Sequence, residues 1–569
     1  MEKIQRILKT RCDIFAALSH FLLSFCWQGK VFIYDKGWSD YLTTVRDTNV
    51  ISDVHEAYLV YILSRAYCLL ILWGGWKLFF FILNGNIDKI DLIILGTILV
   101  VGLFVGVVSF PNNIGLEVDN YANFYMSRRF QPTYWQNIYT GALYGGCLMV
   151  LPHPIALVLI QWIFFWAVVS YIYLGIKSLY AGNKKYLALL FFLLPESYYL
   201  SYNSYRNNYY SVLLLLYISY LYFYVKNNSE EIISRKNILL FSLFTSFLMV
   251  WRSEGVLIGV GGLSVFLIAI NLKKVKKKIY FLVLILTIIS TIFFSQIQSI
   301  GAKKYYGQDY MIINTTQVLY GMLNNPNINL SYDGAEEDLE SIEAIVPVEV
   351  LKEYGMTGYR NYNWNKGRAD FNQTLATDKQ VADYMKGYRH IVLKNLSIFL
   401  DIQANSFFHA LQLDTNRPAY EYKGAHEVVL SSFAYGPHQA GFTELVETKY
   451  TNMWSQNSAR IVLNAIVGDF IGIWREFILN SGLNSIAHAV IFLMLVIIAI
   501  RELLRLLEKG EYRFFSVYFV IAAFTVLAEC MVIMIFMPVA KEAYLYPMLY
   551  SGYLVILFYL LERTRINSL

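Results

Sequence analysis

The stretch that decides the fold is KIDLIILGTILVVGLFVGVVSF (Lys89–Phe110), followed without a break by PNNIGLEVDNY (Pro111–Tyr121). The first part is long enough to cross a bilayer, which requires roughly 20 mainly apolar residues. The second part places Glu117 and Asp119 just beyond the end of that run. Carboxylates beside a bilayer are costly to dehydrate. These two are therefore either solvated loop charges or groups with chemistry at the membrane surface.

The composition of the whole chain agrees with a membrane protein. Of its 569 residues, 57% are hydrophobic and 15% are charged, with a mean hydropathy of +0.43. Soluble domains carry about 25% charged residues. The net charge of +6 gives no reason to invoke nucleic acid, and the five cysteines show neither a disulfide framework nor a zinc spacing. The sequence predicts an all-α polytopic membrane protein.

Apolar runs and basic loops together predict the topology. We expect about twelve spans, near residues 13–34, 58–83, 90–110, 154–176, 186–202, 207–226, 237–251, 253–272, 279–299, 484–505, 513–537 and 543–561. Alternate short loops hold most of the Lys and Arg, above all the cluster Lys273–Lys278. The positive-inside rule puts those loops in the cytoplasm, together with both termini. The composition is typical of a bacterium, so we expect a multi-pass protein of the plasma membrane.

This topology divides the chain into four parts. Residues 1–89 form an N-terminal pair of spans with an outer loop, and residues 90–299 form a core with an outer loop at 111–153. Residues 300–483 are long for a connection and are expected to form a mainly helical extracytoplasmic domain. Within it, helices are predicted at 376–411 and at 461–480, the second lying on or against the membrane. Residues 484–569 supply the last spans.

Several polar residues are predicted on the outer face, where basic groups run against the usual charge bias. Arginine binds phosphate oxygens in pairs, and a carboxylate can accept a proton from a hydroxyl. Each residue also has a structural interpretation, as a solvated charge, an interface anchor or a capping group. Glu529 and His488 lie inside predicted spans, where ionisable groups are functional candidates or packing groups. The outer candidates are Glu117, Asp119, Arg128, Arg129, Arg206, Arg252, Lys541 and Tyr544.

The order of these motifs resembles the GT-C superfamily of membrane glycosyltransferases, which includes protein O-mannosyltransferases and aminoarabinose transferases. The similar parts begin with Glu117-Val118-Asp119-Asn120-Tyr121, which a short helix and the next span follow. They continue with the outer turn around Arg206, the turn Trp251-Arg252-Ser253-Glu254-Gly255, and Lys541…Tyr544…Pro547 before the last span. The similarity covers roughly residues 90–299 and, more faintly, 484–561.

The resemblance implies an inverting transfer of a sugar from a polyprenyl-phosphate donor to a glycan or lipid-linked acceptor at the outer face. By position, Asp119 is then the first choice for the general base and Glu117 the second. The family often has an adjacent acidic pair, whereas Val118 separates the two acids here, so the assignment stays open between them. Arg128, Arg129, Arg206, Arg252, Lys541 and Tyr544 would bind substrate. No cofactor and no metal site are expected, although the two loop acids could hold a divalent cation.

Two other functions remain open from the sequence. A polysaccharide polymerase or ligase acting on lipid-diphosphate-linked glycans would rely on basic residues of the large outer segment, namely Arg360, Arg368, Arg389 and His390. A transporter or flippase would require charged groups at the bilayer midplane and repeated halves with broken helices. The sequence shows no internal repeat, so we expect this class least.

Overall fold

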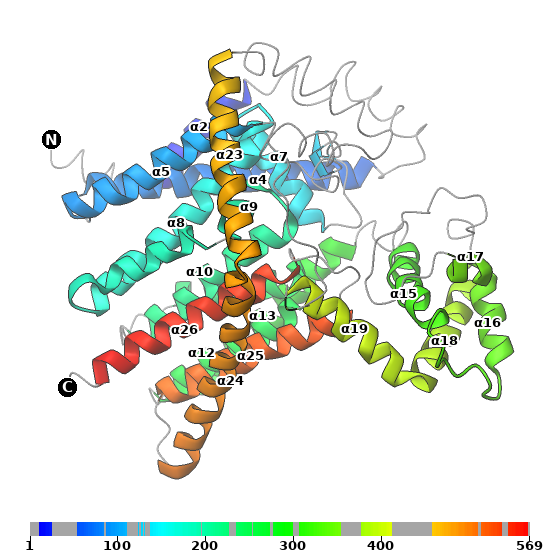
Figure 1. Cartoon of the computed structure of the whole chain (residues 1–569). Coiled ribbons are helices and arrows are strands. Elements are labelled where there is room, and N and C mark those ends of the chain that lie inside the picture. Colours follow the sequence, from blue (N-terminus) through cyan, green and yellow to red (C-terminus); the bar gives the residue numbers. More distant parts are fainter. Residues whose placement is uncertain are drawn as a thin grey trace. The chain divides into compact units, whose positions relative to one another are not determined.

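The structure is a computed structural model of the whole chain, and every element that it describes is a helix (Figure 1). It describes residues 11–25, 54–84, 87–110, 123–124, 127–128, 130, 137–194, 196–226, 235–252, 254–272, 277–299, 307–353, 377–411, 413, 458–509, 514–536 and 544–566.

The helices fall into two compact units. Unit 1 consists of residues 1–229, 420–481 and 561–569, and unit 2 of residues 230–419 and 482–560. Unit 1 contains α2 (Cys12–Ser24), α4 (Val54–Leu83), α5 (Lys89–Ser109), α7 (Ile138–Val150), α8 (Ile155–Leu179), η1 (Gly182–Phe192), α9 (Ser197–Tyr202), α10 (Arg206–Lys226) and α23 (Ser458–Asn480). Unit 2 contains α11 (Arg235–Trp251), α12 (Gly255–Leu272), α13 (Lys277–Ser299), α15 (Gly307–Leu323), α16 (Ala335–Glu343), α17 (Val348–Glu353), α18 (Asp378–Lys394), α19 (Leu396–Ala410), α24 (Leu483–Lys509) and α25 (Phe514–Phe536). The last helix, α26 (Tyr546–Ile566), belongs mostly to unit 2 and ends in unit 1.

Six of the described helices are long and apolar enough to cross a membrane. They cover Ala57–Leu83, Lys89–Ser109, Ile155–Leu179, Lys278–Ser299, Leu483–Glu508 and Phe515–Ile535. Each coincides with one of the spans predicted from the sequence. These helices are consistent with a membrane protein, and among the described residues the other predicted spans coincide with shorter or more polar helices.

Two predicted helices are interrupted. The span expected at 186–202 is not one helix, because a 3₁₀ helix (η1) ends at Phe192 and the short α9 begins at Ser197. Pro195 lies between them in the sequence and lacks the N–H that a continuous helix would need. The helix expected at 376–411 is divided at Asn395 into α18 and α19. The side-chain amide of Asn395 donates to the carbonyl oxygens of Asn329 and Ile391 at this division.

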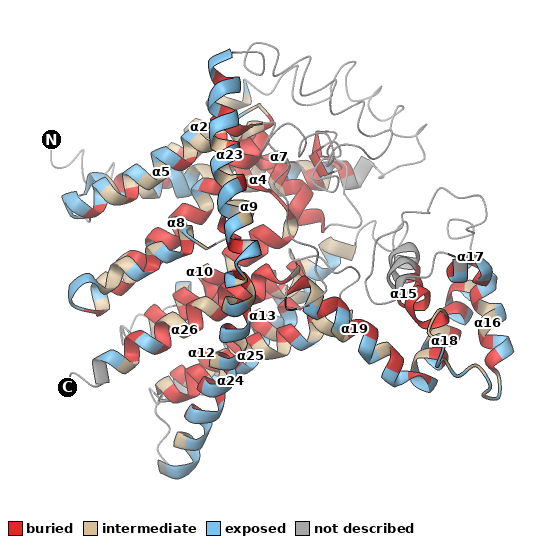
Figure 2. Cartoon of the chain, viewed as in Figure 1, coloured by how far each residue is buried: buried red, intermediate tan, exposed pale blue. Residues whose placement is uncertain are grey.

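Unit 1 is built on the antiparallel contact of α5 and α8. Two tryptophans of α8 donate hydrogen bonds to carbonyl oxygens of α5, from Trp166 to Leu95 at 2.9 Å and from Trp162 to Leu99 at 3.2 Å. The approach is so close that a Cβ on Gly102 would lie 1.9 Å from the Trp162 ring. Buried residues dominate α7, α8 and α10, whereas the outward face of α5 is exposed and apolar (Figure 2). That pattern is typical of a bundle packed within a membrane.

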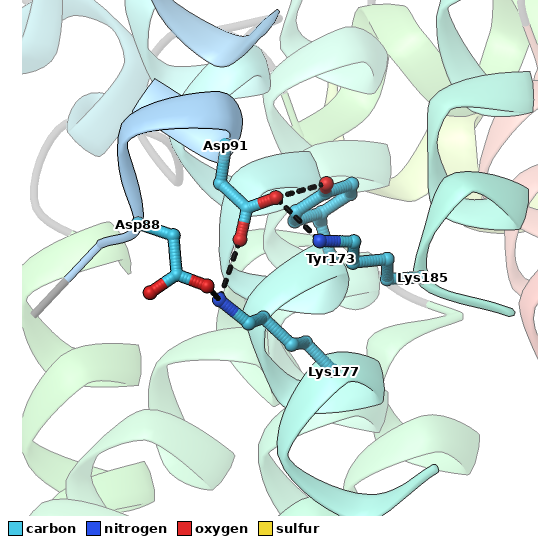
Figure 3. A network of polar contacts seen from close by, with 5 residues as sticks. All are labelled: Asp88, Asp91, Tyr173, Lys177 and Lys185. Atoms are coloured by element: carbon cyan, nitrogen blue, oxygen red, sulfur yellow. Dashed lines mark hydrogen bonds and ion pairs between the residues drawn. The ribbon is translucent and has the colours of Figure 1, made fainter. Parts of the chain in front are cut away.

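A polar network closes the Lys89 end of α5 (Figure 3). Asp91 is fully buried and accepts from Tyr173 at 2.7 Å, from Lys177 at 2.6 Å and from Lys185 at 2.5 Å. Lys177 also pairs with the exposed Asp88. Since both carboxylate oxygens of Asp91 are occupied by strong donors, its charge is compensated. The network ties α5 to the end of α8 and to η1.

A second buried carboxylate, Glu562, lies at the same end of unit 1. Glu562 pairs with Lys226 and accepts from the hydroxyls of Tyr222, at 2.5 Å, and Tyr180. Lys184 donates to the Thr564 hydroxyl at 2.9 Å. The start of α5 and the ends of α8, α10 and α26 therefore share one end of the unit. These are segments that the charge bias assigned to a single side of the membrane.

Unit 2 contains a helical bundle and a smaller helical cluster. In the bundle, α11 packs against α12 and α13, and α25 packs against α12 and α24. Helices α15 to α19 surround a separate apolar core that includes Leu319, Ile342 and Ile391. Within this core Tyr384 is buried and bonds the hydroxyls of Thr315 and Thr316 at 3.0 and 3.1 Å. Burial is the main reason why the pKa of Tyr384 lies above its usual range.

Candidate functional site

In unit 2, the turn between α11 and α12 holds a buried ion pair. The N–H of Gly255 bonds the Arg252 carbonyl at 3.0 Å, which closes the turn and starts α12. Both charged side chains of the turn are buried, with 7% of Arg252 and 6% of Glu254 exposed. Arg252 donates from Nε to Glu254 Oε1 at 2.7 Å and from Nη2 to the same oxygen. These two nitrogens form one edge of the planar guanidinium, so Nη1 points away from Glu254.

Tyr544 lies against this ion pair, although it is far away in the sequence. The guanidinium carbon of Arg252 lies 5.7 Å from the centre of the Tyr544 ring. A cation at this distance from an aromatic face is attracted by the ring. Tyr544 lies two residues before the start of α26, so the structure brings together two residues that the sequence pointed to separately as substrate-binding groups.

Glu529 is the third charged residue of this cluster. It lies on α25, is fully buried, and interacts electrostatically with both Glu254 and Arg252. Neither of its carboxylate oxygens has a hydrogen-bond partner among the described residues. An isolated buried carboxylate is costly unless it is neutralised or paired. Glu529 thus differs from Asp91, whose two carboxylate oxygens are both bonded, and from Glu562, whose Oε1 is bonded.

Close helix contacts fix the position of Glu529. A Cβ on Gly261 of α12 would lie 2.3 Å from the hydroxyl oxygen of Thr525, which is one helical turn before Glu529. Further along α25, the Gln403 amide of α19 donates to the carbonyl oxygen of Ile535. His488 of α24 is fully buried and lies 2.8 Å from the carbonyl oxygen of Leu411, so it serves as a packing group.

In unit 1, Arg128, one of the outer-face candidates from the sequence, is buried. Only 4% of it is exposed, and its guanidinium carbon lies 5.6 Å from the centre of the Phe124 ring. The adjacent Ser127 donates to the Gly141 carbonyl of α7 at 2.8 Å. The next described residue, Phe130, has a φ of 52°. This left-handed conformation is costly for a bulky residue, so packing must hold the turn in place.

Arg206 is the first residue of α10 and is half-buried. The turn before it is held by the Tyr144 hydroxyl of α7, which donates to the Ser204 carbonyl, and by Asn208, which donates to the Asn203 carbonyl at 2.8 Å. The segments that carry Arg128 and Arg206 are therefore both fastened to the first half of α7. A cation at a helix N-terminus opposes the helix dipole, and an anion bound there relieves this.

Four of the predicted site residues lie outside the described residues, namely Glu117, Asp119, Arg129 and Lys541. Within the described part of the chain, no group of three or more His, Cys, Asp or Glu side chains is placed to hold a metal ion.

The basic residues favoured by the polymerase interpretation are only partly described. Arg360 and Arg368 lie outside the described residues, and Arg389 is exposed on α18. His390 lies 3.2 Å from Asp338, which also accepts from Tyr332 at 2.9 Å. Burial, and then this hydrogen bond, raise the pKa of Tyr332 above its usual range. These contacts connect α16 and α18 within the small cluster.

Two features of the structure had little or no signal in the sequence. Glu254 stands two residues after Arg252, but its role as the partner of that arginine depends on how the turn folds. In the sequence, Asp91 is an ordinary charge near the start of an apolar run. Its position inside a predicted span is the one signal that it has a specific partner or role.

Comparison of the chain with protein-family models, curated proteins and solved structures found no match.

Proposed function

We propose that this protein is a membrane glycosyltransferase that moves a sugar from a polyprenyl-phosphate donor to a cell-surface glycan or lipid-linked acceptor. The observation that carries the proposal is the cluster of Arg252, Glu254, Glu529 and Tyr544 in unit 2. It combines an oriented arginine, an aromatic face and a buried carboxylate without a hydrogen-bond partner among the described residues. The guanidinium can donate to a phosphate oxygen, and the carboxylate without a bonded partner can accept from a hydroxyl.

In the proposed mechanism, Arg252 binds the donor phosphate. Glu254 orients the guanidinium by one edge, and the oriented guanidinium would donate to a phosphate oxygen. A charge-assisted hydrogen bond strengthens as negative charge develops on the departing phosphate. Arg206, Arg128, Arg129, Lys541 and Tyr544 contribute further contacts to the substrates. Asp119, with Glu117 as the alternative, removes the proton from the acceptor hydroxyl.

The proposed reaction requires a particular topology. We propose that α2, α10, α11, α12 and α26 cross the membrane in addition to the six apolar helices, and that η1 and α9 form one interrupted crossing. Both termini are then cytoplasmic, and the Arg252 turn and the residues before α26 are extracytoplasmic. The helical cluster α15–α19 lies on that outer side and contributes to acceptor choice.

Transfer by the purified protein tests the proposal directly. The chain is reconstituted in lipid and supplied with a panel of polyprenyl-phosphate sugars and a glycan-lipid acceptor extract. Asp119→Asn is expected to lower the transfer rate by about 10²–10⁴-fold, because asparagine cannot accept the proton. Glu117→Gln is expected to cost less. A larger loss for Glu117→Gln would exchange the two roles, and full activity of the double variant would refute the proposed base.

Donor binding separates the role of Arg252 from the chemical step. Arg252→Lys keeps a positive charge beside Glu254 but loses the planar fork. We expect the donor Kd to rise by roughly 10- to 100-fold, the equivalent of one charge-assisted bond. The matched control is Arg389→Lys, at an exposed arginine of α18. Loss of activity in this control with normal donor binding by Arg252→Lys would favour the polymerase interpretation.

A further inference from the structure

Helix α23 has the burial pattern of a membrane-embedded helix, with polar and small residues inside and apolar residues outside. Its buried residues are Arg460, Asn464, Gly468 and Gly472, which repeat every four residues, and Ile478 nearer the end of the helix. The opposite face exposes large apolar side chains, from 38% for Leu463 to 73% for Phe470. This exposed face comprises Ile461, Val462, Leu463, Ile466, Phe470, Ile473, Trp474 and Phe477. A helix on a soluble protein would show the reverse arrangement.

The position of α23 within unit 1 connects this face to a second apolar surface. The helix packs against α5, and Arg460 donates to the carbonyl oxygen of Phe110, the residue that ends α5. The candidate span α5 itself exposes apolar side chains, including Ile93, Val100 and Phe104. Both helices of this contact therefore expose large apolar side chains.

The direction and charges of α23 argue against a membrane crossing. Figure 1 shows α23 running across α5 rather than along it. The helix carries Arg460, Asp469, Arg475 and Glu476, and it is not among the six apolar helices that could span a bilayer. Asp469 is exposed near its middle, where a span would be at its most apolar.

We propose that α23 lies in the plane of the membrane–water boundary at the Phe110 end of α5, with its apolar face against lipid acyl chains. Trp474 and the phenylalanines suit that level of the bilayer, where amphipathic rings concentrate. The buried residues fasten the helix to unit 1, so the helix extends the lipid contact of the bundle parallel to the membrane. This inference does not depend on the proposed sugar transfer.

Site-directed spin labelling of the full chain in lipid nanodiscs tests the inference. Single nitroxides at Ile461, Ile466, Ile473 and Phe477, in a chain whose five cysteines are replaced, report collision rates with oxygen and with a water-soluble nickel chelate. We expect oxygen to dominate at all four positions, at similar and shallow depths. Val100 of α5 serves as the deep lipid control, and the exposed Lys386 of α18 as the water control.

Three results would overturn the inference. Nickel accessibility equal to that of Lys386 would mean that the face is in water. Low accessibility to both probes would mean that protein covers it, either another segment of this chain or a second copy. A depth that changes steadily from Ile461 to Phe477 would mean that the helix crosses the bilayer. If the cysteine-free chain does not fold, lipids with a photoreactive acyl chain can be crosslinked to the unmodified protein, and adducts are expected at Phe470 and Phe477.

Discussion

Asp91 in unit 1 and Glu529 in unit 2 are both fully buried carboxylates on apolar helices, yet their surroundings differ completely. Asp91 accepts from two lysines and a tyrosine, and Lys177 is shared with Asp88. Glu529 has no hydrogen-bond donor among the described residues and lies near an arginine already bonded to Glu254. Burial of a charged group is therefore a weak sign of function by itself. A buried carboxylate whose oxygens are bonded to protein donors serves the structure. A buried carboxylate without such bonds is a candidate for binding a ligand.

The largest effect is expected from breaking the satisfied network. Asp91→Ala leaves Lys177 and Lys185 without their shared buried partner, so the free energy of unfolding should fall by about 3–5 kcal/mol. Thermal and denaturant unfolding in detergent measure this loss. Asp88→Ala is the control, because the Asp88 side chain is 72% exposed and its contact with Lys177 should contribute little. Equal losses of unfolding free energy in the two variants would show that the buried network around Asp91 does not stabilise the fold.

A smaller effect is expected at the helix contact that positions Glu529. Gly261→Ala places a methyl group 2.3 Å from the Thr525 hydroxyl oxygen, so α12 and α25 must separate. Such overpacking typically costs about 1–3 kcal/mol. Gly96→Ala on α5 is the matched control, since no atom lies within 4 Å of its Cβ position. Helix propensity alone should make that control neutral or slightly stabilising. If the Gly261→Ala protein is as stable as the parent and binds the donor equally well, the contact between α12 and α25 does not position Glu529.

The smallest effect on stability is expected at Glu529 itself. Glu529→Met removes a carboxylate without a bonded partner, so the free energy of unfolding should stay the same or rise by about 1 kcal/mol. Glu562→Met should instead destabilise the protein, because Lys226 loses its buried partner. The two variants should change the free energy of unfolding in opposite directions, or at least by clearly different amounts, when they are unfolded in parallel experiments. Equal destabilisation would mean that Glu529 is a structural group like the other two.

Much of the helical framework could be predicted from local sequence. All six apolar helices coincide with predicted spans, and the turn that carries Arg252 lies where the run of apolar residues breaks. Helix α7 also follows the expected order, beginning at a cap where Asn137 accepts from the N–H of Thr140 at 2.7 Å. These features depend on the lengths of apolar runs and on residues a few positions apart. The break at 192–197 was missed because hydropathy alone does not register the effect of Pro195.

The candidate site could be predicted only in part. Arg252 and Tyr544 were both named from the sequence, and the structure shows that they are in contact. The pairing of Arg252 with Glu254, the burial of Arg128 and the lack of a hydrogen-bond donor at Glu529 among the described residues could not be predicted. The Arg252–Glu254 pair depends on how a single turn folds, and the surroundings of Arg128 and Glu529 depend on how segments pack. Glu117 and Asp119 remain predictions from the resemblance.

The sequence by itself determined the class of this protein, because a long apolar run with few charges is stable only as a helix within a bilayer or within a protein core. It also determined where most helices begin and end, since backbone hydrogen bonding and capping are local. Only the tertiary structure decided what the polar residues do. Asp91 serves the structure because lysines from α8 and η1 reach it, and Glu529 stayed without a bonded partner among the described residues. Such differences arise from packing between helices, which a one-dimensional pattern does not record.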